Sequence, residues 1–166
     1  MDILAHFLWT AALFWQTRYR WWAGLMGFVP DILSFGLLFV GELGHLTGGK
    51  PELHTIPSYI FTMYNITHSY VVWAALFGAV WLVMRKPPYI LLAWALHITI
   101  DIFTHSPAYF PTPLFWPLSN WKYLYGVSWG TPVFMAINYG ALALLYGYIA
   151  WHAFSRRKTA QSIKTK

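Results

Sequence analysis

The sequence predicts an all-α, polytopic membrane protein with about five transmembrane helices, and three observations lead to this class. Hydrophobic residues make up 58% of the 166-residue chain and charged residues only 10%, too few to cover a soluble globule of this size. The apolar residues fall into long runs separated by short polar or proline-rich stretches. Basic residues cluster between these runs, as in cytoplasmic loops of membrane proteins. We therefore expect one transmembrane domain over 1–154 and a basic, frayed cytoplasmic tail over 155–166.

The apolar runs set the order of the predicted elements. The expected spans are residues 3–16, 21–43, 57–84, 89–105 and 131–154. Proline lacks a backbone donor and disfavours helix in the preceding residue, so the second span should break at Pro30 and restart as helix at Asp31. The third span is long enough to need tilt or an interfacial first turn. A polar loop is expected over 44–56, and the proline- and aromatic-rich stretch 106–130 should lie on lipid headgroups.

The lysines and arginines predict the orientation. If the N-terminus is outside and the C-terminus is cytoplasmic, all eleven of them except Lys50 and Lys122 face the cytoplasm. This topology also explains the net charge of +6, so we expect no nucleic-acid partner. The chain has no cysteine, which excludes disulfides, thiolate metal sites and a cysteine nucleophile.

A row of polar residues runs along the fourth span. His97, Asp101 and His105 recur at every fourth position, which places them on nearly the same face of a helix. An ionisable residue inside a membrane span costs a few kcal/mol at least, and by default it marks a site with a partner. Three such residues on one face suggest a metal.

Other spans bring ionisable residues to a similar depth. At about 1.5 Å per residue, Asp31 and His68 lie near the middle of the membrane, level with the inner end of this row. His6 is expected near the outer surface. Two buried carboxylates with no lysine or arginine at that depth are costly unless a cation neutralises them.

These positions predict a divalent metal site. The expected ligands are Asp31, His68, His97 and Asp101, with His6 and His105 as secondary, catalytic candidates. Histidine and carboxylate ligands suit zinc, manganese or iron, and we expect zinc. Four protein ligands fill nearly all positions of a zinc ion, whereas a second metal, bridged by a shared carboxylate and held partly by His6, leaves room for water. Ser69 and Thr104 are expected to orient the ligands.

Three other interpretations remain open at this point. A buried histidine–carboxylate pair that only fixes helix packing would explain His97 and Asp101 taken alone. A metal or proton transporter would also place histidine and aspartate at mid-membrane, although the fourth span is apolar on the inner side of His97. A haem-binding membrane protein could use His68 and His97 but leaves the aspartates unexplained.

A set of short motifs occurs in a fixed order along residues 1–120. The motifs are MDILAH at the start, Pro30-Asp31, Thr67-His68-Ser69, His97-x-x-x-Asp101-x-x-Thr104 and Pro117-Leu118-Ser119. In this order they resemble the YdjM-like family of LexA-regulated inner-membrane proteins, which are described as metal-dependent hydrolases. The chain departs from the family at Leu33, where a second Asp is usual, and at Tyr64-Asn65, where Arg-Gly is usual. The resemblance implies a multi-pass protein of a bacterial or archaeal cytoplasmic membrane.

The order His6, Asp31, His68, His97-x-x-x-Asp101 is also similar to the ligand order of zinc-dependent phospholipase C enzymes. That likeness implies that Asp31, His68, His97 and Asp101 hold one zinc and that Asp101 and His6 reach a second. The later His-x-x-x-Glu pair of those enzymes has no match here. Together these features imply a membrane-embedded metal-dependent hydrolase acting on a lipid-linked phosphoester, with membrane lipids as partners and an undefined oligomeric state.

Overall fold

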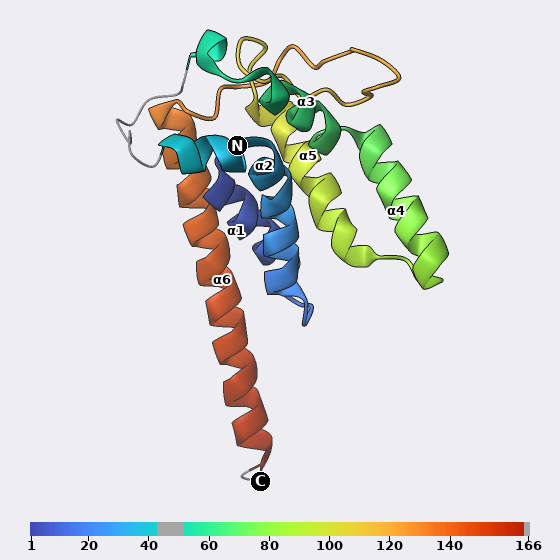
Figure 1. Cartoon of the computed structure of the whole chain (residues 1–166). Helices are drawn as coiled ribbons and strands as arrows, with labels where there is room; N and C mark the ends of the chain where they lie inside the picture. The colour runs from blue at the N-terminus through green and yellow to red at the C-terminus, as the bar shows by residue number, and fades with distance from the viewer. Residues whose placement is uncertain (43–51, 165–166) are drawn as a thin grey trace.

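The computed structural model describes residues 1–42 and 52–164, and all regular structure in these ranges is helical (Figure 1). The α-helices are α1 (Ile3–Leu13), α2 (Arg20–Glu42), α3 (Ser58–Thr67), α4 (Tyr70–Met84), α5 (Leu92–Thr104) and α6 (Pro132–Lys164). Two short 3-10 helices, η1 (Leu53–Thr55) and η2 (Tyr89–Leu91), precede α3 and α5. The all-α prediction is thus confirmed for this part of the chain. Most of the polar loop predicted over 44–56 lies outside the described residues.

Two of the described helices are long and apolar enough to cross a membrane. They are Arg20–Leu38 within α2 and Pro132–Arg156 within α6. α3 and α4 pass the same test only as a pair, and the two helices are bent by 57° relative to one another. α1 and the Tyr89–Thr104 segment are apolar but shorter. With 11 residues, α1 is roughly 16 Å long, about half of a ~30 Å hydrocarbon core. The structure therefore contains two, or at most three, candidate spans.

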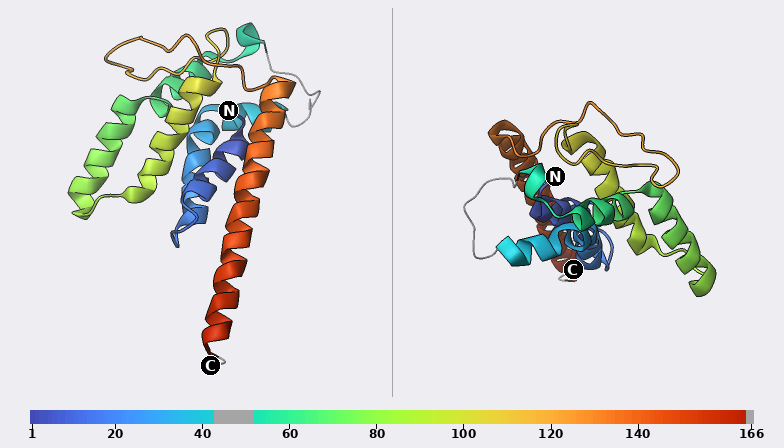
Figure 2. Two further views of the ribbon diagram at one scale, coloured as in Figure 1. Left: turned by 180° about the vertical axis from the view of Figure 1, so that it is seen from behind. Right: turned by 45° about the horizontal axis from the view of Figure 1, so that its top comes forward.

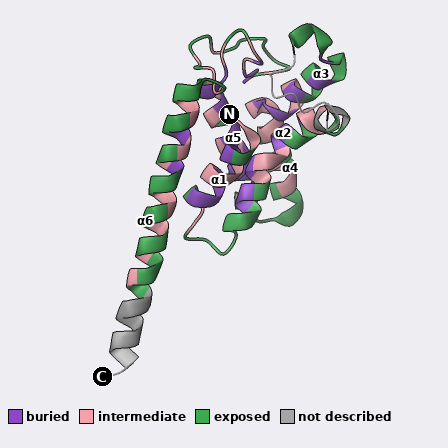
Figure 3. Cartoon of the chain, turned by 90° about the vertical axis from the view of Figure 1, so that its left-hand side faces the viewer, coloured by how far each residue is buried: buried purple, intermediate pink, exposed green. Residues whose placement is uncertain are grey.

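The helices form a bundle with loops at both ends. α1 packs against α2, α2 also contacts α3 and α5, and α6 lies along α1 (Figure 1). Loop 106–130 covers one end of this bundle. The turn between α1 and α2, the turn between α4 and α5, and the C-terminal end of α6 all lie at the opposite end (Figure 2). Buried residues concentrate in α1, α2 and α5, whereas most of α6 is exposed (Figure 3).

The predicted third span is interrupted between α3 and α4. His68 ends α3, and Ser69, with an extended backbone, caps α4 by accepting hydrogen bonds from the N–H groups of Val71 and Val72 at 3.1 and 3.4 Å. The backbone N–H of Tyr70 is bonded to a loop carbonyl at 2.9 Å, not to its own helix. Side-chain capping and this long-range bond together satisfy the groups exposed by the break.

The expected break at Pro30 is wrong, because α2 continues through this residue. A proline inside a helix removes one hydrogen bond and strains the preceding turn. Here α2 is packed against α1, α3 and α5, and tertiary packing of this kind supplies most of the stability of a helix. The local preference of proline is therefore outweighed.

The predicted frayed tail also differs, because α6 extends through residues 155–164 to Lys164. This stretch contains no proline or glycine, and several of its residues are strong helix formers.

Candidate metal centre

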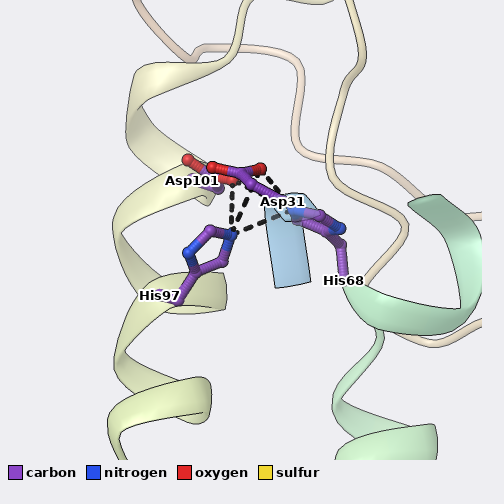
Figure 4. Close-up of side chains that lie close together, drawn as sticks. All are labelled: Asp31, His68, His97 and Asp101. Atoms are coloured by element: carbon purple, nitrogen blue, oxygen red, sulfur yellow. Dashed lines mark hydrogen bonds and ion pairs between the residues drawn. The ribbon is translucent and has the colours of Figure 1, made fainter. Parts of the chain in front are cut away.

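The structure brings together the four residues expected to hold a metal. Asp31 lies in the interior of α2, His68 follows the last residue of α3, and His97 and Asp101 lie one turn apart on α5 (Figure 4). Each is at most 4% exposed. One ligand atom from each residue lies within 4.8 Å of the other three. Three separate helical segments thus converge on one buried point.

The distances from the two imidazole nitrogens to one another and to the carboxylate oxygens are close to those of a tetrahedral metal site. The Nε2 atoms of His68 and His97 are 3.0 Å apart, and they lie 3.4 and 3.3 Å from Oδ2 of Asp101. Oδ1 of Asp31 lies 3.5 Å from Nε2 of His68 and 3.8 Å from Nε2 of His97. Ligands held at 2.0–2.1 Å by a tetrahedral zinc are about 3.3–3.4 Å from one another.

The positions of the N–H protons on the two imidazoles favour a cation between them. Nδ1 of His97 lies 2.7 Å from the carbonyl oxygen of Gly27, and Nδ1 of His68 lies 3.2 Å from that of Tyr64. A carbonyl only accepts, so each Nδ1 carries the single N–H of a neutral imidazole and each Nε2 presents a lone pair. The two Nε2 lone pairs and the carboxylate oxygens are all acceptors and face one another. An additional proton would form a hydrogen bond in only one of these contacts, whereas a metal ion would bind all four atoms.

The carboxylates support the same conclusion. Oδ2 of Asp31 and Oδ2 of Asp101 are buried and accept no hydrogen bond. A buried carboxylate oxygen without a partner is costly. Among the described residues no lysine or arginine side chain is paired with either aspartate, and the ammonium group of Met1 pairs with Oδ1 of Asp101 and leaves both Oδ2 atoms without a partner. The donor set and its unpartnered oxygens therefore fit a divalent metal such as zinc.

Asp101 also faces a second group of polar atoms with its other oxygen. Oδ1 lies 2.9 Å from Nε2 of His6 and 3.4 Å from Nε2 of His105. It also accepts hydrogen bonds from the hydroxyl of Thr104, at 3.3 Å, and from the amino group of Met1. Asp101 is therefore shared between the four-residue cluster and a second histidine pair.

His6, a secondary candidate in the sequence, lies within this site. It is fully buried, and its ring stacks on that of His97 with centroids 3.7 Å apart. α1 begins beside Asp101 and continues away from it, so the first turn of α1 is inside the bundle. The sequence named His6 as a candidate, but its contacts with His97 and Asp101 required the structure, because no periodicity relates one helix to another.

His105 is held by a polar contact that the sequence did not indicate. Its Nδ1 lies 2.8 Å from the carbonyl oxygen of Phe110, which also accepts a hydrogen bond from the hydroxyl of Tyr64 at 2.7 Å. Phe110 has a φ of 50°, an uncommon conformation for a bulky residue, and its ring stacks on Phe61 at 5.0 Å. Because Nδ1 donates to a carbonyl, Nε2 of His105 is an acceptor directed at Asp101.

The two residues expected to orient the ligands have different roles. Thr104 contacts Asp101, but Ser69 caps α4 and contacts the carbonyl oxygen of Leu114 at 3.4 Å. Thr67, which the sequence offered only as part of a motif, contacts Nδ1 of His68, and Ser34, which the sequence did not single out, contacts Thr67.

Loop 106–130 closes the site at its end of the bundle. Its N–H groups at Val127 and Trp129 donate to the carbonyls of Phe103 and Thr104 at 2.9 and 3.0 Å, which ties the loop to the end of α5. Gly126 lies so close to the carbonyl of His105 that any larger side chain would collide with it. The backbone of the loop is therefore packed directly on the helix that carries the site.

No family model, curated protein or solved structure matches this chain. What the site can do is therefore argued from its own residues.

Proposed function

We propose that this protein is a membrane-embedded, metal-dependent hydrolase that acts on a lipid-linked phosphoester. The observation that carries the proposal is the convergence of Asp31, His68, His97 and Asp101 on one buried point, with two carboxylate oxygens unpartnered. A divalent metal bound there, zinc by our proposal, supplies Lewis acidity toward a phosphoryl oxygen and activates water for attack on phosphorus.

A hydrolase needs a metal position open to water and substrate, and we place this position beside Oδ1 of Asp101. A zinc whose positions are all filled by protein is typical of a structural site. His6 and His105 face Oδ1 of Asp101, so our proposal places a second metal position there, bridged by this carboxylate. This side is where water and the phosphoryl group would be held.

The residues around this second side have definable roles. The carbonyl of Phe110 holds the N–H of His105 at Nδ1, so Nε2 is the atom that can bind a metal or accept a proton. Thr104 donates to Oδ1 of Asp101 and thereby limits rotation of the carboxylate. Both residues lie under loop 106–130, which excludes bulk water from the site.

The geometry supports the alternatives less well. The Nε2 atoms of His68 and His97 are 3.0 Å apart, which leaves no room for a porphyrin between two axial histidines. A transporter requires polar residues on both sides of the site, but α5 continues from His97 toward Leu92 through apolar residues.

Membership of the YdjM-like family is part of the proposal and is based on the order of the sequence motifs. A multi-pass location in a cytoplasmic membrane is also part of the proposal. The five apolar segments would each cross the bilayer, or enter it as short or bent helices, with the N-terminus outside and the C-terminus in the cytoplasm. The basic residues of the α1–α2 and α4–α5 turns lie at the end of the bundle opposite loop 106–130, as this orientation requires (Figure 2).

Cysteine labelling tests this orientation. Ser119 and Lys86 are both exposed and belong to opposite ends of the bundle. In intact cells, an impermeant thiol reagent should modify the Ser119→Cys variant and spare the Lys86→Cys variant. Both variants should react after the membrane is permeabilised. Labelling of Lys86→Cys alone in intact cells would reverse the proposed orientation.

A lipid substrate is proposed because of the surface of loop 106–130. Leu118, Trp121 and Tyr125 are 80%, 51% and 83% exposed, and Lys122 is the only charged residue in the loop. Aromatic and apolar side chains of this kind belong at a membrane interface. A lipid lying there could present its phosphoester to the site below the loop.

Turnover of matched substrates tests the function. The purified, zinc-loaded protein should hydrolyse a long-chain phospholipid or polyprenyl phosphoester at least tenfold faster than its short-chain analogue, because only the long chain contributes binding energy in the membrane. Trp121→Ala should weaken lipid turnover without changing metal content. Equal turnover of the two substrates would exclude lipid specificity, and no turnover of any phosphoester by metal-loaded protein would refute the hydrolase.

A further inference from the structure

A chain of buried hydroxyl groups connects His68 to the backbone of α2 directly before Asp31. Oγ of Ser34 lies 2.7 Å from Oγ1 of Thr67, which in turn lies 2.9 Å from Nδ1 of His68. Ser34 also donates to the carbonyl oxygen of Pro30 at 2.8 Å, and Pro30 directly precedes Asp31. Ser34, Thr67 and His68 are 1%, 3% and 0% exposed, so bulk water cannot replace these bonds.

The direction of these bonds follows from what each group can donate. The carbonyls of Pro30 and Met63 only accept, so either Ser34 donates to Pro30 and accepts from Thr67, or Thr67 donates to Met63 and accepts from Ser34. Thr67 then accepts from Nδ1 of His68, whose N–H also faces the carbonyl oxygen of Tyr64 at 3.2 Å. This arrangement keeps the lone pair of Nε2 directed toward Asp31 and the other ligands.

Thr67 itself is fixed from several elements. Its hydroxyl lies 2.9 Å from the carbonyl oxygen of Met63 within α3, and its own carbonyl accepts the indole N–H of Trp94 on α5 at 2.7 Å. If the Thr67 proton goes to Met63, Ser34 donates to Thr67 instead of Pro30, and the Thr67 oxygen still accepts from His68. His68 follows the last residue of α3, so no further helical turn supports it. Its orientation depends on such contacts.

We propose that Ser34 and Thr67 are positioning residues for His68. They fix the tautomer and the ring orientation of this ligand, and they couple it to the segment of α2 that carries Asp31. The inference rests on the proposed function, since it takes His68 to be a metal ligand.

Hydroxyl-deletion variants test the inference through metal binding. Thr67→Val keeps the size of the side chain but removes the hydroxyl. It should lower zinc affinity, measured by competition with a chelator, by about 10- to 100-fold, which is usual for the loss of such partners. The absorption spectrum of the cobalt-substituted protein should change as well, because His68 is reoriented. Thr67→Ser should restore affinity and spectrum nearly to wild type.

Ser34 provides an independent arm of the same experiment. Ser34→Ala should lower affinity several-fold, and Ser34→Ala/Thr67→Val should lose no more than Thr67→Val alone, because Ser34 acts through Thr67. Thr62→Val, an exposed threonine on the same helix, is the matched control and should bind zinc as wild type does.

The outcomes separate this inference from the proposed function. If wild-type protein binds zinc and Thr67→Val binds it equally well with an unchanged cobalt spectrum, the positioning role is refuted and the metal site stands. Additive losses in the double variant would refute the link through Ser34. If wild-type protein binds neither zinc nor cobalt, the proposed function and this inference fail together. If Thr67→Val does not fold, the zinc affinity of Ser34→Ala is the test. An unchanged affinity in that variant would refute the positioning role of the Ser34–Thr67 hydrogen bond.

Discussion

α2 and α6 are both apolar and long enough to cross a membrane, yet they serve different purposes. The mean hydropathy of their spans is similar, 1.3 and 1.6, but 33% of the α2 span is buried inside the protein and only 11% of the α6 span. α2 carries Asp31 and Ser34 into the site, whereas the buried polar residue of α6, Asn138, bonds the indole N–H of Trp9 on α1 at 2.8 Å. Hydropathy thus identifies both helices, and the buried carboxylate of Asp31 distinguishes the one that builds the site.

Histidine substitutions should show this contrast most strongly. His97→Ala removes a ligand and should lower zinc affinity by more than the roughly 100-fold upper limit for residues that merely orient a ligand. His105→Ala should cost less, about tenfold, because Asp101 is the one residue of the four-residue cluster for which a contact with His105 is seen. His152→Ala, on α6, should have no effect. Chelator competition with all three purified variants is the measurement, and an equal loss in His97→Ala and His152→Ala would break the comparison.

Glycine substitutions should give a smaller effect, on stability. A Cβ atom at Gly27 of α2 would lie 2.7 Å from Cγ2 of Thr10 on α1, so Gly27→Ala should destabilise the protein by about 1–3 kcal/mol. Gly140 of α6 has nothing within 4 Å of its Cβ position, and Gly140→Ala should be neutral or slightly stabilising. Thermal unfolding in detergent measures both. Gly27→Ala should also weaken zinc binding, since the Gly27 carbonyl holds His97.

If Gly140→Ala proves as destabilising as Gly27→Ala, then α6 is packed closely against another protein surface in the membrane. Its exposed face would in that case not be a lipid-facing surface.

Much of the site was predictable because charge is rare in apolar segments. His97 and Asp101 are four residues apart within an apolar run, and Asp31 is the only acidic residue in the middle of its own run. Such residues are conspicuous, and their helical spacing gives their common face. That they meet at one point required the structure, since no periodicity relates one helix to another.

The break at His68 and the continuity at Pro30 were both missed, for the same reason. Local preferences suggested a single span over 57–84, tilted or with an interfacial first turn, and a break in α2, but tertiary contacts decided otherwise. Ser69 and the bond from Tyr70 to the loop stabilise the break, and packing on several sides supports α2.

The contacts of the hydroxyl groups around the ligands could not be predicted. Ser34, Thr67 and Tyr64 are uncharged, and hydroxyl groups occur in many membrane helices without a functional role. Only their distances to His68, to His105 and to one another reveal what they contact.

Metal analysis of purified wild-type and Asp101→Asn protein tests the central claim most directly. The amide is nearly isosteric with the carboxylate but binds cations far less well, so the helices should remain folded by circular dichroism while the metal is lost. We expect wild-type protein to retain at least one divalent ion per chain after gel filtration and to release it to a chelator or on acidification, as protons compete for the imidazole nitrogens. Equal metal content in the two proteins, or a metal-free wild type purified with zinc present, would contradict the account.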